Sequence, residues 1–188
     1  MPGEFMTLYA SPDTHDAGAP TRPGADEDPL VKYVVATAAA VRRAEVLVVR
    51  DRLLTARRGL ATVGLVCALL HDNAEASEQQ LDAFAFGSQM AEHACAELDR
   101  VLDAEEVARL REDLALVRLL RERAAVAVTD PDGHPVLDTL VRLADAVQDL
   151  TAPLARNPLV TLALRAAAEY ARAASWQIWI RFGGPTAW

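Results

Sequence analysis

Apolar side chains recur every three or four residues along most of this chain from residue 29 onward. This spacing places them on one face of an α-helix, and no stretch of the chain alternates apolar and polar residues convincingly enough to predict a strand. Turn and cap residues divide the pattern into segments. We therefore predict about six helices, at residues 29–58, 60–74, 78–102, 104–128, 136–150 and 159–182.

The boundaries of these helices follow from particular residues. Gly59 is predicted to end the first helix, because glycine weakens a helix interior. The helix at 60–74 is apolar on nearly all faces, which is typical of a central, buried helix. Ser77 and Gln80 have the spacing of a capping box at the start of the third helix, and Asp103 is predicted to cap the fourth.

Residues 1–28 have a different character from the rest of the chain. They are rich in Pro, Gly, Asp and Thr, and no helical or strand period runs through them. Such a segment cannot bury enough apolar surface to order itself, so we predict a flexible N-terminal arm. The remaining residues, 29–188, are predicted to form a single all-α domain, which suits the length of the chain.

Composition and charge narrow the function. Apolar residues make up 52% of the 188 residues and charged residues 24%, as in a soluble protein. The net charge is −8 and no basic block stands out, which argues against nucleic acid as a partner. The most apolar run, 60–70, is too short to span a membrane, and the N-terminus has no signal core. We expect a cytoplasmic protein, and the abundance of Ala, Arg and Val is typical of a bacterial source with GC-rich DNA.

Two cysteines and one polar cluster carry candidate chemistry. Cys67 and Cys95 lack metal-like spacing and are predicted to be buried, reduced thiols. His71 and Asp72 end the apolar helix at 60–74, and Glu75 follows four residues after His71. An imidazole and two carboxylates at one end of a helix suit a divalent metal or an acid–base pair. The alternative is a histidine satisfied by backbone carbonyls and an ordinary helix end.

The late residue Asp145 has two interpretations. On its own it belongs to a ladder of surface charges spaced for ion pairs along one helix: Asp138, Arg142, Asp145 and Asp149. In combination with the His-Asp pair it gains another meaning. The stretch Ala68–Asp72, followed about seventy residues later by Leu143-Ala144-Asp145, resembles the HD-domain superfamily of metal-dependent phosphohydrolases.

This resemblance covers roughly residues 29–182 and implies an all-α HD-type fold. It implies that His71, Asp72 and Asp145 are metal ligands, and that Glu75 matches the catalytic Glu of the 5′-deoxynucleotidase-like branch. His71 is the other residue expected to take part in catalysis. The chain departs from the family at 34–38, where the first metal-binding His is missing. A divalent ion (Mn²⁺, Co²⁺ or Mg²⁺) held by a three-ligand remnant is therefore expected, with a metal-free site as the alternative.

Three functions remain open at this point. The first is a divergent HD-type enzyme acting on a small phosphorylated or similarly anionic metabolite. The second is a metal-free HD-fold enzyme in biosynthesis, performing elimination or cyclisation with His71 or Glu75 as general base. The third is a catalytically inactive HD-like subunit that stabilises a partner protein.

The last predicted helix carries a candidate interface. Trp176, Trp179 and Ile180 fall on one face of it. These side chains are expected either to pack in the core, or to form the interface of a homo- or hetero-oligomer, such as a dimer, or the wall of a ligand pocket.

Overall fold

The computed structural model describes residues 29–73, 77–110 and 135–183. Within these ranges every regular element is a helix, which confirms the all-α class. The predicted N-terminal arm, Glu75 and the greater part of the predicted helix at 104–128 lie outside the described residues. The elements are α1 (Pro29–Arg43), the 3₁₀ turn η2 (Ala44–Val46), α2 (Val49–Asn73), α3 (Glu78–Asp99), α4 (Ala104–Arg109), α6 (Pro135–Arg156) and α7 (Leu162–Arg181).

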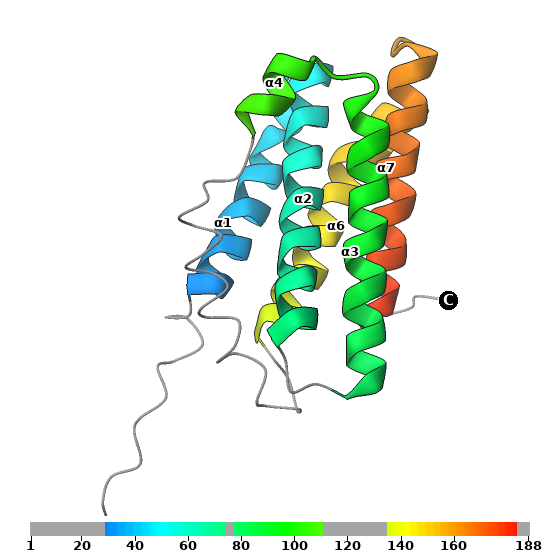
Figure 1. Cartoon of the computed structure of the whole chain (residues 1–188). Coiled ribbons are helices and arrows are strands. Elements are labelled where there is room, and N and C mark those ends of the chain that lie inside the picture. Colours follow the sequence, from blue (N-terminus) through cyan, green and yellow to red (C-terminus); the bar gives the residue numbers. More distant parts are fainter. Residues whose placement is uncertain (1–28, 74–76, 111–134, 184–188) are drawn as a thin grey trace, which may run out of the picture.

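The helices form a bundle with α2 at its centre (Figure 1). α2 contacts α1, α3, α6 and α7, as expected for the most apolar predicted helix. α6 lies behind α2 in this view and packs against α1 and α2, and α7 packs against α6 and α3 at one edge of the bundle. The short helix α4 lies across one end (Figure 1).

The first predicted boundary is wrong, and its correction explains a glycine. The chain breaks at η2 and the two residues after it, where Leu47 is extended, and α2 then runs without interruption through Gly59. A β-carbon at Gly59 would lie 2.7 Å from Val147 Cγ2 and 3.2 Å from Val41 Cγ2. Gly59 therefore marks a close approach of three helices, α1, α2 and α6, and does not mark a helix end.

The predicted caps are confirmed, whereas α6 is longer than predicted. The Ser77 side chain accepts from the Gln80 backbone N–H, and the Gln80 side chain accepts from the Ser77 N–H. Asp103 accepts from the Glu105 N–H at 2.8 Å. α6 continues past Leu150 to Arg156 with Pro153 inside it. Proline has no backbone N–H, so Pro153 removes one helical hydrogen bond. The loss falls in the last turns of α6, where backbone carbonyls already lack partners within the helix.

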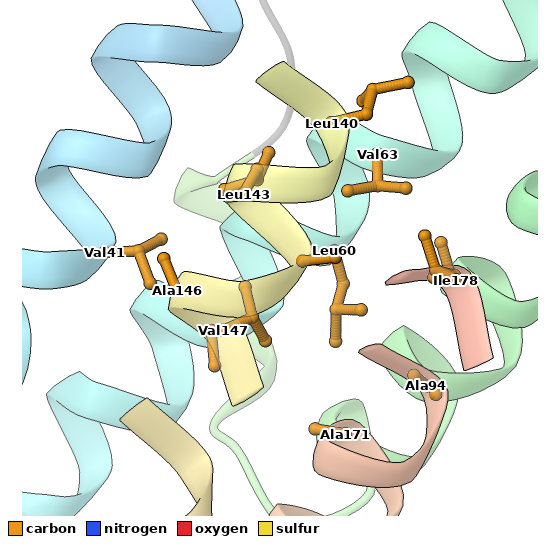
Figure 2. Packing of buried hydrophobic residues seen from close by; sticks show 14 of the residues in the cluster. Val41, Leu60, Val63, Ala94, Leu140, Leu143, Ala146, Val147, Ala171 and Ile178 are labelled. Carbon is orange, nitrogen blue, oxygen red and sulfur yellow. The ribbon is translucent and has the colours of Figure 1, made fainter. Parts of the chain in front are cut away.

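The core is one continuous cluster at the meeting of five helices. Figure 2 shows aliphatic side chains of α2 and α6 interlocking, with alanines of α3 and α7 where those helices approach closely. The labelled residues are Val41 from α1, Leu60 and Val63 from α2, Ala94 from α3, Leu140, Leu143, Ala146 and Val147 from α6, and Ala171 and Ile178 from α7.

α2 is also long and apolar enough to cross a membrane on length and composition alone. However, 61% of that apolar window is buried inside the bundle, as in the core helix of a soluble protein. Cys67, on the same helix, is fully buried, and burial raises the pKa of its thiol. Neither Cys67 nor Cys95 forms a disulfide, and Cys95 is partly buried.

Candidate functional site

The His-Asp pair lies at the end of α2, as the sequence predicts, but on the surface. Leu69 and Leu70 are buried, and the chain then emerges into solvent. The side chain of His71 is 47% exposed and that of Asp72 is 63% exposed, with 3.5 Å between His71 Nδ1 and Asp72 Oδ1. The pair that ends this apolar helix therefore faces water.

A groove of about 250 Å³ runs from this pair across to α3. α2 supplies an imidazole and a carboxylate, and α3 supplies a hydroxyl, an amide and a second carboxylate. None of the described residues that line it is a lysine or an arginine, so these residues give the groove a negative charge. The lining residues are Ala68, His71, Asp72, Ala85, Ser88, Gln89 and Glu92.

Asp145 does not join this groove. Two contacts show that α2 and α6 run antiparallel. Arg52 Nη2 donates to the Leu150 carbonyl at 3.1 Å, and Gly59, further along α2, lies against the earlier residue Val147. Asp145 is therefore level with the Gly59 region of α2. His71 is twelve residues further along α2, which is about 18 Å at the rise of an α-helix.

The predicted ligand set of His71, Asp72 and Asp145 is thus not assembled. Within the three described ranges, no group of three or more His, Cys, Asp or Glu side chains is placed to hold a metal ion. The physical reason is that Asp145 lies beside the middle of α2, whereas His71 lies at its C-terminal end. These residues do not fit the divalent cation that the resemblance implies, and Glu75 lies outside the described residues.

Asp145 belongs instead to a group of charges near the junction of α1 and η2. The pKa of its neighbour Asp149 is raised, first by burial and then by the charges of Asp145 and Glu45, while Arg42 opposes the rise. The charges of Asp145 and Asp149 therefore oppose each other, and the ladder of helix ion pairs that the spacing of Asp145 offers as its other interpretation stays a prediction.

A larger hollow, of about 490 Å³, lies between α2, α3 and α4. At its floor the Arg57 guanidinium makes a bidentate ion pair with Asp99, at 2.5 and 3.0 Å. Its other lining is mostly apolar and extends to Leu110, where the described residues stop. Because the two charges neutralise each other, we assign no chemistry to this hollow.

The outer face of α7 is exposed and carries apolar side chains together with the exposed charges of Glu169 and Arg181. Trp176 and Trp179 stack on each other, with ring centroids 4.9 Å apart, and both are partly exposed. Tyr170 is 41% exposed and Ile180 37%. Leu159 in the preceding turn is 93% exposed. The predicted Trp-bearing face therefore lies at the rim between the core and solvent.

The sequence pattern did not identify Ser88, Gln89 and Glu92 as neighbours of the His71–Asp72 pair, because the pair was related to the later Asp145. The signal for their position is the pair of glycines Gly64 and Gly87. A β-carbon at Gly64 would lie 3.2 Å from Ala91 Cβ, and one at Gly87 would lie 2.8 Å from Cys67 Sγ. Small residues at matched positions mark where two helices approach, and here they set the register of α3 against α2.

Searches of protein-family models, curated protein sequences and solved structures return no match for this chain. The HD-domain resemblance therefore stays a prediction, and the function of the protein is inferred from the geometry of its helices and side chains.

Proposed function

We propose that this protein is an interaction subunit, a helical domain that works by assembling with protein through the outer face of α7. The observation that carries the proposal is the concentration of exposed apolar side chains there. Eight large hydrophobic residues of the described ranges are exposed. Four belong to α7 or to the turn that leads into it, namely Leu159, Leu162, Tyr170 and Ile180, and three, Val46, Leu47 and Val48, belong to the connection between α1 and α2.

Exposed apolar surface of this kind is unfavourable in water, and binding of a protein partner would remove it from water. Burying apolar surface contributes roughly 25 cal/mol per Å², and contiguous apolar patches on a soluble protein mark interaction sites. The stacked Trp176 and Trp179 lie beside this face, and tryptophan is enriched among the side chains that dominate binding energies. Glu169 forms an ion pair with Arg172 on the same helix.

A photo-reactive amino acid at Gln177 tests the proposal in the cell that makes the protein. Gln177 is exposed on the outer face of α7, and Gln79, exposed at the start of α3, is the matched control. We expect protein adducts from the Gln177 position and none from Gln79, with the adducts identified by peptide mass. Equal labelling at both positions, or none at either, would overturn the proposal.

A second candidate function is favoured by the groove between α2 and α3. His71, Asp72 and Glu92 line one small space, and an imidazole beside carboxylates can accept and donate protons. The second candidate is therefore a small-molecule enzyme, either of HD type or metal-free. With two carboxylates and no basic side chain in its lining, the groove suits a cationic group, and an anionic metabolite requires a bridging cation.

Paramagnetic broadening separates the metal-dependent form of this candidate from the others. If a cation binds there, substoichiometric Mn²⁺ broadens the NMR signals of His71 and Glu92 before those of Asp145, which lies level with the Gly59 region of α2. Uniform, weak broadening over the acidic surface would remove the metal-dependent hydrolase. A ligand screen against the groove would then address only metal-free chemistry.

A further inference from the structure

We infer that the protein partner of α7 presents an acidic segment, which binds along a stripe of arginine and tryptophan side chains on the side of α7 that adjoins α6. The inference rests on the proposed function, since it names the chemistry of the partner of the same helix. Three observations carry it: the charge of α7, the make-up of the stripe and an arginine nitrogen that lacks a partner.

α7 carries positive charge in a strongly acidic chain. Its charged residues are three arginines and one glutamate, a net charge of +2, whereas the whole chain has −8. The pKa of Glu169 is lowered, first by its hydrogen bonds with Arg172 and also by the charge of Arg156, so Arg156 in the last turn of α6 lies near this side of α7. A basic surface on an acidic protein attracts acidic partners and repels a second copy of the same helix.

The stripe consists of five residues on one side of α7. They are separated by four, three, four and three positions, and all are at least partly exposed: Arg165, Glu169, Arg172, Trp176 and Trp179. The stripe lies between the buried positions Ala168 and Ser175 and the exposed positions Ala173 and Ile180. Tryptophan and arginine are enriched among the side chains that dominate binding energies, and this side of α7 brings both types together.

The stripe carries more positive charge than its own carboxylate neutralises. Glu169 accepts two hydrogen bonds from Arg172, at 2.8 and 2.6 Å, so its carboxylate is already engaged. In the part of the chain that the structure describes, Arg165 Nε is buried without a hydrogen-bond partner. Such a group is unfavourable. A carboxylate from a partner would place negative charge beside this guanidinium, and charge-assisted pairs of arginine with carboxylate are strong.

The order of residues along the stripe also constrains the partner. The two arginines lie in its first half and the two stacked tryptophans in its second half. From Arg165 to Trp179 the stripe extends over fourteen residues, which is about 21 Å at the rise of an α-helix. A matching segment is therefore acidic at one end, where it meets the arginines, and apolar at the other, where it covers the indole rings.

The photo-reactive amino acid at Gln177, next to Trp176, tests the stripe when the charges are changed. With Arg165→Glu we expect the yield of protein adducts to fall about tenfold, because an attraction becomes a repulsion. Arg165→Lys keeps the charge and should retain most of the yield. Arg58→Glu, the same reversal at an exposed arginine of α2, should leave the yield unchanged. Circular dichroism checks folding, and Arg172→Gln, which should also lower the yield, decides the matter if Arg165→Glu is unfolded.

Two further measurements test the chemistry of the partner. The cross-linked peptide, identified by mass, should contain more Asp and Glu than Lys and Arg. In a cell extract the adduct yield should fall as the salt concentration rises from about 0.05 to about 0.5 M, because salt screens charges that are exposed to solvent. Treatment of the extract with nuclease should leave the yield unchanged.

Each outcome decides the inference. An adduct whose yield is indifferent to the changes at Arg165 and Arg172 or to salt, or a cross-linked peptide without an acidic excess, overturns the inference while the proposed function stands. Loss of the adduct on nuclease treatment means that nucleic acid phosphates meet the arginines, and it overturns the inference too. If the probe labels nothing, both fall. A probe that labels residues 1–28 of its own chain means that this segment covers the face, and it overturns both.

Discussion

Replacing Gly59 by alanine is expected to destabilise this bundle, although alanine is the better helix former. In an exposed helix the change stabilises by about 1 kcal/mol. Here the new β-carbon would lie 2.7 Å from Val147 Cγ2 and 3.2 Å from Val41 Cγ2. Valine has little rotamer freedom in a helix, so α2 and α6 must move apart. Overpacking of this kind costs about 1–3 kcal/mol, which leaves a net loss of about 0–2 kcal/mol.

The sign of the effect should depend on Val147. In a Val147→Ala background the close methyl group is gone, and the nearest remaining contacts of the new β-carbon are Val41 Cγ2 at 3.2 Å and Leu143 Cδ1 at 3.5 Å. Gly59→Ala should then stabilise the protein by up to about 1 kcal/mol, because only the gain in helix propensity remains. The two substitutions are therefore expected to be strongly non-additive.

Urea unfolding followed by circular dichroism measures both effects, provided the m-value is unchanged. Gly64→Ala is the matched control on the same helix, because its β-carbon would meet only Ala91 Cβ at 3.2 Å and the Ser88 carbonyl at 3.8 Å. Its effect should be smaller than that of Gly59→Ala. The reasoning is refuted if Gly59→Ala stabilises the wild-type protein, or if it has the same effect with and without Val147.

Three further predictions use other described contacts. Ser77→Ala removes half of the capping box of α3 and should cost about 1 kcal/mol in urea unfolding; no loss would show that the cap is not needed. The raised pKa of Asp149 means that its charge is unfavourable in the folded state above that pKa and is relieved as the pH falls toward the ordinary value. Asp149→Asn should therefore raise Tm at neutral pH, with the difference shrinking in acid; a constant difference would contradict this. Cys67, buried and with a raised pKa, should react with a thiol reagent only as fast as the protein unfolds, whereas a faster reaction at Cys67 than at Cys95 would contradict the packing.

The helices were largely predictable because their signals are local. The apolar period and the caps at Ser77 and Asp103 are visible in a few adjacent residues, and the structure has both. The helix end predicted at Gly59 was wrong because the sequence alone does not distinguish a glycine that ends a helix from a glycine that allows helices to approach closely. Only the neighbours at Val41 and Val147, far away in the chain, distinguish the two.

The candidate site was less predictable because it depends on which helices are neighbours and in what direction they run. The sequence places His71 and Asp72 at the end of α2, and the structure has them there. It does not indicate that α6 runs antiparallel to α2 with Leu150 beside Arg52, which separates Asp145 from His71. The positions of the groove residues on α3 follow from the register of α3 against α2, which Gly64 and Gly87 set.

The central position of α2 also has a consequence for how the molecule opens. α2 contacts four other helices, so the backbone amides of its central turns cannot meet solvent unless the whole bundle comes apart. Those amides should exchange hydrogen slowest, at a rate that reports the global free energy of unfolding. The short helix α4, held to α2 by ion pairs from Arg50 to Asp103 and Glu106, should open on its own and exchange much faster. Hydrogen exchange would thus rank the elements by how many partners each must lose before water reaches it.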